Sequence, residues 1–191
     1  MTEHLALDTQ PNPYKLRIED YDLLDQAGAF AGEPKTELID GVLYQVSPQH
    51  RLHGFAKDEL AYRLRRALEA LGSTLHVATE QSVAMGPYSK PQPDIILTSQ
   101  PRGPGAIPVE SVALIAEIAV SSTDFDLNEK LRIYAAAGIR EYWVVDVNEK
   151  VVRQHWNPNG ESYGEGAELP FGSALRSISI DGLTVETGGL V

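Results

Sequence analysis

The spacing of apolar residues along the chain predicts three helices, at residues 18–28, 52–71 and 123–138. In each segment apolar side chains recur every three or four positions, as they do on the buried face of an amphipathic helix. The stripe of the longest segment consists of Phe55, Leu60, Leu64, Leu68 and Leu71. A glycine closes each segment, and Thr123 or Asp124 is the expected cap of the last one.

Shorter apolar runs predict β-strands. The expected strands are 74–85, 93–98, 112–119, 141–147 and 151–156, with short strands and turns after them. A hairpin is expected at 36–46, where Asp40-Gly41 separates two alternating segments. Strands 93–98 and 112–119 are almost wholly apolar, which is typical of a sheet covered on both faces. Together these elements predict an α/β or α+β domain in which helices flank a mixed central β-sheet.

Composition narrows the class of protein. The chain has no cysteine, which excludes disulfides, thiolate zinc sites and cysteine nucleophiles. No apolar run approaches the ~20 residues that cross a bilayer, and the N-terminus, broken by Pro11 and Pro13, lacks the basic and apolar regions of a secretory signal. We therefore expect a cytoplasmic protein with no membrane partner, made of an N-terminal extension at 1–17 and a single domain at 18–191.

Charge is unevenly distributed along the chain. The net charge of −11 argues against broad nonspecific attraction to nucleic acid, because phosphate binding relies on Lys and Arg. The acidic excess lies at the two ends, however, whereas residues 47–140 carry ten acidic and ten basic side chains. This distribution permits a phosphate-facing centre in the middle of the chain. The candidate contacts on the long helix are Lys57, Arg63, Arg65 and Arg66, although an ordinary solvated surface is an equal explanation for them.

Two acidic residues stand out among the apolar strands. Asp94 lies near the start of one central strand, and Glu117 lies late in the next. If these strands are neighbours, about 4.8 Å apart, the two carboxylates converge at one end of the sheet. Alternation places Glu117 on one face with Ile115 and Ala119, where an unpaired carboxylate costs several kcal/mol. A hard divalent ion such as Mg²⁺ accepts two carboxylates together with water and substrate phosphate. Taken singly, Asp94 is equally typical of a turn and Glu117 of an ion pair with an arginine.

Lys130 is the third candidate. At 100° per residue it lies about 60° from Leu127, within the apolar sector that also holds Leu131 and Tyr134. A lysine on the apolar face of a helix either extends its ammonium past the packed stem into solvent or lies beside acidic groups. Proximity to the two acids would explain its position.

Longer stretches of the sequence resemble a known family. The strings TELIDGVLYQVSP, PQPDIIL and ALIAEIAVSSTDFDLNEKLRIYAAAGIREYWVVD are similar to the Uma2 family (DUF820), a branch of the PD-(D/E)xK nuclease superfamily, over roughly residues 18–156. The resemblance implies a restriction-endonuclease-like core, a mixed sheet flanked by helices. It also implies that Asp94 and Glu117 hold a divalent metal ion, Mg²⁺, which Mn²⁺ can replace.

The sequence departs from the superfamily motif at one position, where Ala119 replaces the expected lysine. In such families the lysine has moved to the following helix, and the resemblance makes Lys130 its counterpart. Glu37, in the string ELIDG, resembles an additional acid that holds a second metal or orients water; an acid on a solvated hairpin surface is the alternative. For His50 and His53, a role at the N-terminus of the long helix is the simpler explanation.

These observations predict metal-dependent hydrolysis of phosphodiester bonds in nucleic acid, with DNA as the expected substrate. Lys130 would stabilise charge on the phosphate or help to deprotonate the attacking water, with a pKa depressed by desolvation and by the metal. A catalytically inactive nuclease fold that binds nucleic acid or protein is the alternative, and the acidic total favours it. A homodimer is also considered, because aromatic residues favour interfaces and the hairpin near the C-terminus contains Tyr142, Trp143 and Trp156. The alternative is that these residues cover the protein's own core.

Overall fold

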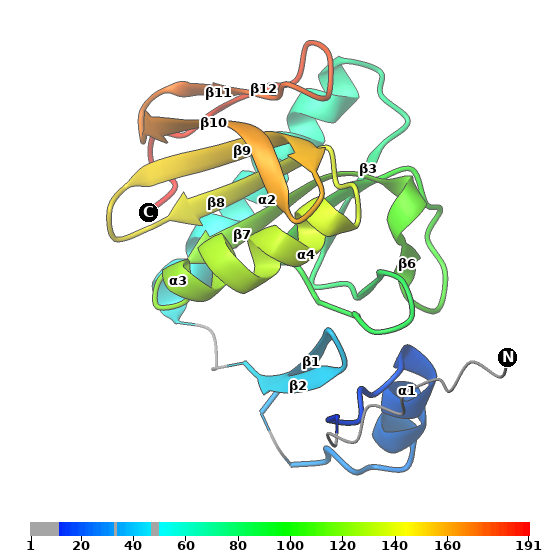
Figure 1. Ribbon diagram of the computed structural model, residues 1–191. Coiled ribbons are helices and arrows are strands. Elements are labelled where there is room, and N and C mark those ends of the chain that lie inside the picture. Colours follow the sequence, from blue (N-terminus) through cyan, green and yellow to red (C-terminus); the bar gives the residue numbers. More distant parts are fainter. Residues whose placement is uncertain (1–11, 33, 47–49) are drawn as a thin grey trace, which may run out of the picture.

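A six-stranded mixed sheet forms the centre of the structure, a computed structural model that describes residues 12–32, 34–46 and 50–191. The strand order is β10-β9-β8-β7-β5-β3 (Figure 1). The strands are β3 (His76–Thr79), β5 (Ile95–Thr98), β7 (Val112–Ala119), β8 (Glu141–Asp146), β9 (Val151–Asn159) and β10 (Ser162–Pro170). The expected mixed central sheet is confirmed. The extension expected at 1–17 begins outside the described residues.

One pair of strands in this sheet, β7 and β8, runs parallel, and its other neighbouring pairs are antiparallel. A parallel pair needs a crossover connection over one face of the sheet. Here the crossover consists of α3 (Thr123–Phe125), a single π-helical turn, η2 (Asp126–Lys130), and α4 (Leu131–Ala136). The helix expected at 123–138 is therefore interrupted by a π turn, and Gly138, at φ +77°, follows its end.

Helices cover both faces of the sheet (Figure 1). On one face α2 (Arg51–Ala70) buries Leu60 and Leu64 against apolar side chains of β5, β7 and β8. On the other face α4 packs over a second apolar cluster, to which Ile115 and Ala119 of β7 belong. The flanking helices expected from the sequence are confirmed. Because side chains of a strand alternate between faces, Glu117 points to the α4 side, as predicted.

Two residues of the predicted stripe in α2 lie outside the core. Phe55 is 63% exposed and Leu71 is 45% exposed, so this part of the prediction is wrong. The buried face follows a spacing of four residues from Ala56, and Phe55 lies about 100° away from that line on the helix. Leu71 is the residue that caps the C-terminus, beyond the last turn that packs on the sheet.

A separate two-stranded hairpin, β1 (Thr36–Ile39) and β2 (Val42–Gln45), lies beside the sheet together with α1 (Ile18–Gln26) (Figure 1). Asp40 and Gly41 both have positive φ, +49° and +80°, as the tight turn of a hairpin requires. The expected hairpin is therefore confirmed. Backbone hydrogen bonds to the segment before β5 dock it, including one of 2.8 Å from the Gly41 N–H to the Tyr88 carbonyl.

Short elements complete the fold. They are β4 (Val83–Ala84), β6 (Ile107–Pro108), the 3₁₀ turn η1 (Val109–Ser111), β11 (Ala174–Arg176) and β12 (Thr184–Glu186). Glu141 holds the segment between β11 and β12 against the sheet, because its fully buried carboxylate accepts hydrogen bonds from Ser177 and Ser179. The buried position of Glu141 is thus stabilised by hydrogen bonds from the segment between β11 and β12.

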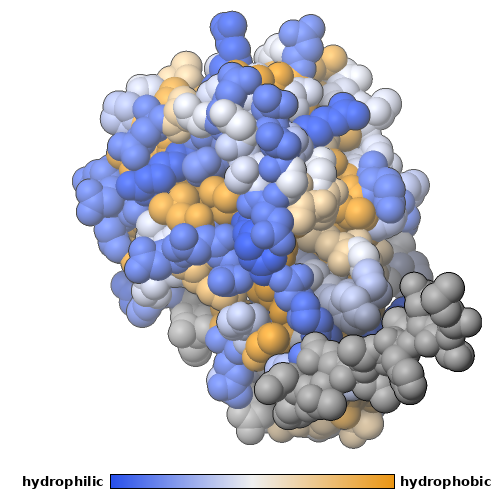
Figure 2. Space-filling model, in the orientation of Figure 1, coloured by the Kyte–Doolittle hydropathy of each residue, from blue (hydrophilic) through white to orange (hydrophobic). Residues whose placement is uncertain are grey.

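The aromatic side chains proposed for an interface belong mainly to the core. Tyr142 and Trp143 are fully buried within this chain, so the role of covering the protein's own core is confirmed for them, whereas Trp156 is half-buried and the homodimer stays a prediction. The face of the molecule in Figure 2 carries apolar residues in small groups separated by hydrophilic ones. Within the described part of the chain, none of the helices has the length and apolar character needed to span a bilayer.

Replacing Gly41 with alanine should destabilise the fold more than its backbone angle alone explains. An added Cβ would lie 2.6 Å from the Lys15 Cβ, whereas at Gly138, with nearly the same φ of +77°, it would meet nothing within 4 Å. Gly138→Ala should cost about 1–2 kcal/mol in free energy of unfolding, and Gly41→Ala about 1–3 kcal/mol more. Urea denaturation of both variants measures this, and equal losses would contradict it.

Candidate active site

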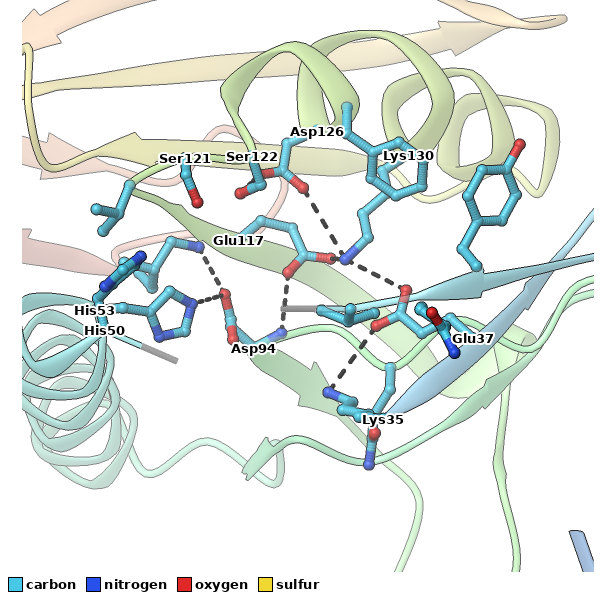
Figure 3. Close-up of a pocket in the computed structure, with 17 residues that line it drawn as sticks. Lys35, Glu37, His50, His53, Asp94, Glu117, Ser121, Ser122, Asp126 and Lys130 are labelled. Carbon is cyan, nitrogen blue, oxygen red and sulfur yellow. Dashed lines mark hydrogen bonds and ion pairs between the residues drawn. The ribbon is translucent and has the colours of Figure 1, made fainter. Parts of the chain in front are cut away.

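Strand pairing places Asp94 directly beside Glu117. Strands β5 and β7 are antiparallel with Ile95 opposite Ala116, so the residue before Ile95 faces the residue after Ala116. The Asp94 N–H donates to Glu117 Oε2 at 3.1 Å, and the Ile118 N–H donates to Asp94 Oδ2 at 2.8 Å. Both carboxylates are buried, and Figure 3 shows them turned toward one another at the end of the strands. Asp94 itself precedes β5 rather than lying within it.

Lys130 reaches the same place from the crossover helix. Its ammonium lies 2.9 Å from Glu117 Oε1, 3.5 Å from Glu37 Oε2 and 3.9 Å from Asp126 Oδ1 (Figure 3). The residue closes the π turn η2, and such turns occur often at functional sites because they change the direction of side chains on a helix. The lysine is buried, so it does not extend into solvent.

The hairpin contributes Glu37. This residue is 1% exposed, so the alternative of an acid on a solvated surface is wrong. Its two oxygens lie between two lysines: Oε2 faces Lys130, and Oε1 lies 3.9 Å from the Lys35 ammonium. The four residues placed by the sequence, Asp94, Glu117, Lys130 and Glu37, therefore meet in one cluster drawn from β1, the start of β5, β7 and η2.

Sequence reasoning missed Asp126 and the role of Tyr134. Asp126 is 2% exposed and accepts a hydrogen bond of 2.6 Å from the Ser122 hydroxyl. The Tyr134 hydroxyl donates to Glu117 Oε1 at 2.6 Å. The signal was available in the spacing, because Asp126, Lys130 and Tyr134 stand four residues apart and so share one face of a helix.

His53, in the first turn of α2, contacts Asp94 rather than capping the helix. Its Nε2 lies 3.0 Å from Asp94 Oδ2, and its Nδ1 is buried without a hydrogen-bond partner in the described structure. His50 is the residue at the N-cap, and its side chain makes no capping hydrogen bond. The expected role of both histidines at the helix N-terminus is therefore wrong.

The carboxylates respond differently to burial. Burial raises the pKa of Glu117 to about 8 and that of Asp126 to about 6, although the charge of Lys130 opposes both shifts. Burial also acts against ionisation of Asp94, but His53, the Ile118 N–H and the charge of Lys130 together outweigh it and lower the pKa of Asp94 below its ordinary value. Without a bound metal ion, ionised Asp94 thus lies beside a Glu117 carboxyl that tends to keep its proton even with Lys130 against it.

Lys130 remains protonated. Burial by itself would lower the pKa of this ammonium, but the surrounding carboxylates, Glu117 foremost, outweigh the burial and raise the pKa above its ordinary value. The depression expected from desolvation is therefore wrong for the metal-free site, and the depression expected from a bound metal stays a prediction. Without a metal ion the side chain is a cation held among carboxylates.

The cluster lines a cavity of about 260 Å³. Its charged lining comprises Glu37, Asp94, Glu117 and Asp126 against Lys35 and Lys130, an excess of two negative charges when all four carboxylates are ionised and of one when Glu117 keeps its proton, the histidines being neutral. Among the described residues, no three His, Cys, Asp or Glu side chains are gathered as a ready-made metal centre. The donor set nevertheless fits Mg²⁺, which uses one or two carboxylates and completes its shell with water and phosphate.

Three of the four basic residues considered on α2 have partners inside the protein. Lys57 pairs with Glu80, Arg63 pairs with Glu59, and Arg66 lies over the Tyr62 ring. Arg65 is exposed and has no ion pair in the described part of the chain. This leaves Arg65 as the residue of that set free to meet a phosphate.

Comparison with known sequences identifies the family. A sequence model of Uma2, described as "Putative restriction endonuclease", matches residues 18–185. The chain belongs to the Uma2 family. The match extends past the stretch that the sequence strings covered and includes each of the clustered acids and Lys130.

One solved structure has a fold similar to that of this chain. It is a crystal structure described as "a putative nuclease belonging to DUF820 from Anabaena variabilis ATCC 29413". The two proteins share 17% identity with a TM-score of 0.59, and the similarity covers 76% of this chain and 83% of the other. No curated protein matches this sequence. The restriction-endonuclease-like arrangement expected from the sequence is consistent with this fold.

Replacing Lys130 with methionine should strongly destabilise the metal-free protein. The change keeps the stem but removes the ammonium that lies within 4 Å of three buried carboxylates. Removing one partner of a buried ion pair costs about 3–5 kcal/mol, whereas Lys150→Met, in an exposed turn, should cost almost nothing. Urea denaturation in EDTA measures the loss, and adding Glu117→Gln to Lys130→Met should recover part of it. Equal stability of the two lysine variants would contradict this account.

Proposed function

We propose that the protein is a metal-dependent endonuclease that hydrolyses phosphodiester bonds in nucleic acid, DNA first of all. The proposal rests on one observation: two buried carboxylates, Asp94 and Glu117, lie side by side at the edge of a cavity with a protonated lysine against them. Membership of the Uma2 family supports the same class of reaction.

Asp94 and Glu117 are the residues that would hold Mg²⁺, with Mn²⁺ able to replace it. Asp94 Oδ2 is occupied by the Ile118 N–H and His53, which leaves Oδ1, without a hydrogen bond in the described structure, for the ion. Glu117 is held by Lys130 and its neighbours at a fixed orientation. When bound, a divalent ion neutralises charge on the phosphate and lowers the pKa of a water molecule.

Lys130 supplies a permanent positive charge to the reaction. Three carboxylates hold its ammonium against the wall of the cavity, where it can donate to an oxygen of the scissile phosphate. A preorganised donor of this kind stabilises the negative charge that develops in the transition state. Glu37 lies 3.5 Å from the ammonium on the hairpin side, and under this proposal it would orient the attacking water. Attack in line with the 3′ oxygen would leave a 5′-phosphate and a 3′-hydroxyl.

Binding of Mn²⁺ should raise the melting temperature of the wild-type protein. At about 100 times its Kd the ion should add about 2.7 kcal/mol of stability, which corresponds to roughly 5–10 °C for a chain of this size. Asp94→Asn and Glu117→Gln should each abolish most of the shift relative to their own metal-free state. The exposed acid Asp124 provides the matched control, because Asp124→Asn should keep the full shift. Retention of the shift in both site variants would place the ion elsewhere.

Nicking of supercoiled plasmid in Mg²⁺ or Mn²⁺ tests the reaction itself. Glu117→Gln and Lys130→Met should each reduce the rate by roughly 100- to 1,000-fold, as expected for loss of a group that acts on the transition state. Asp124→Asn should nick at the wild-type rate, and EDTA should stop all nicking.

Two outcomes would overturn the assignment. Equal nicking by all variants would identify a contaminating nuclease. Absence of nicking by the wild type, with the Mn²⁺ shift intact, would indicate an inactive nuclease fold that binds nucleic acid or protein, the alternative raised by the sequence.

A further inference from the structure

A second hollow, of about 340 Å³, lies along the edge of the central sheet. Its lining comes from β3, from Arg65 of α2 and from the loop at 100–107, which is rich in proline and glycine. Strand β3 is the last strand of the sheet and pairs with β5 alone, so the backbone groups of its outer edge face this hollow rather than another strand. We call the hollow the β3-edge groove.

The charge of the β3-edge groove differs from that of the protein as a whole. The chain carries a net charge of −11, yet no acidic residue lines the groove. Its ionisable side chains are Arg65, Arg102 and His76, all exposed. Neither guanidinium forms an ion pair within the described residues. Two arginines that form no ion pair, in a groove lined by no acidic residue, form a surface suited to phosphate, which guanidinium binds in a bidentate manner.

The β3-edge groove lies close to the candidate active site. Thr79 and Gln81 line the groove, and Gln92 lines the catalytic cavity. Glu80 lies between the two hollows: its N–H donates to the Asp94 carbonyl at 3.2 Å, and its own carbonyl accepts a hydrogen bond from the Gln92 side chain. The backbone of Glu80, flanked by two residues of the groove, is therefore bonded directly to Asp94 and Gln92 of the catalytic cavity.

The length of the groove suits several phosphates. The four residues of β3 extend over about 10 Å at 3.3 Å per residue. One strand of a duplex presents a phosphate every ~3.4 Å along the axis, and the spacing along the winding backbone is larger, so about two to three phosphates span that length. A strand whose scissile phosphate lies in the catalytic cavity would thus place its neighbouring phosphates beside Arg65 and Arg102.

We propose that the β3-edge groove binds the nucleic-acid backbone on one side of the cleaved bond, through Arg65 and Arg102. The identity of the ligand rests on the proposed function. The free edge of β3 is also a template for an added peptide strand. Phosphate is the better match, because the charged groups of the groove are all cationic and its arginines have no partners in the described structure.

The salt dependence of binding tests the groove. Fluorescence anisotropy with a labelled 20-base-pair duplex would compare Arg65→Gln/Arg102→Gln with the matched control Arg140→Gln/Arg176→Gln, both in a Glu117→Gln background that leaves the duplex intact. The control arginines are exposed and lie outside the groove, and both doubles change the net charge equally. Losing two phosphate contacts should lower the slope of log K against log[salt] by about 1.8, since each contributes about 0.9.

The expected result is a lower slope and at least a tenfold weaker affinity for the groove double, with the control unchanged. An equal slope in both doubles would overturn the proposal and leave the edge of β3 to a peptide strand, which binds through backbone groups. Absence of duplex binding in the control would overturn it as well. Plasmid nicking reports the proposed function independently, so a nuclease that does not use this groove would be recognised as such.

Discussion

The structure depends on a close approach of two acids that elementary electrostatics disfavours. Asp94 and Glu117 each accept a backbone N–H from the other strand, so the register of β5 and β7 forces the carboxylates together in a buried place. Two neighbouring carboxylates that are both ionised and removed from water cost several kcal/mol, unless a proton or a cation compensates for their charge. The neighbouring elements supply that compensation: His53 from α2 stabilises ionised Asp94, and Lys130 from η2 stabilises Glu117.

The topology of the sheet explains why the compensating groups arrive where they do. The parallel pairing of β7 and β8 makes the chain cross one face of the sheet, and the crossover covers the face to which Glu117 points. Lys130 and Tyr134, one helical turn apart, both donate to the same oxygen of Glu117. Arg132 on this segment pairs with Asp40 in the turn of the hairpin, which ties the strand that carries Glu37 to the helix that carries Lys130. The contacts that dock these elements on one another are consequently also the contacts that assemble the site.

Local pattern was sufficient for the elements and for part of the site. The limits of β7 match the predicted strand at 112–119, and the helical projection placed Lys130 on the inner face. The contact of His53 with Asp94 was beyond such reasoning, because 41 positions separate them and only the docking of α2 on the sheet joins them. The π turn was equally invisible, since it changes no apolar spacing. Phe55 was wrongly assigned to the buried face, because apolar spacing alone does not determine which of two adjacent rows of residues on a helix packs on the sheet.

The distribution of charge gives the two hollows different parts in substrate binding. The catalytic cavity is lined by more carboxylates than lysines and keeps a negative excess even when Glu117 holds its proton, so by itself it repels a phosphate. The β3-edge groove is lined by no acidic residue, and it lies close to the cavity, because Glu80, next to the groove residues Thr79 and Gln81, is hydrogen-bonded to the backbone of Asp94. Under the proposed function a polyanion can therefore dock in the groove before the cavity accepts it, and the cavity accepts it only when its surplus charge is neutralised. Under the proposal, the arginines of the groove provide affinity for the substrate, and the carboxylates of the cavity restrict binding of the scissile phosphate to the metal-bound site. This separation would let an acidic protein act on an acidic polymer.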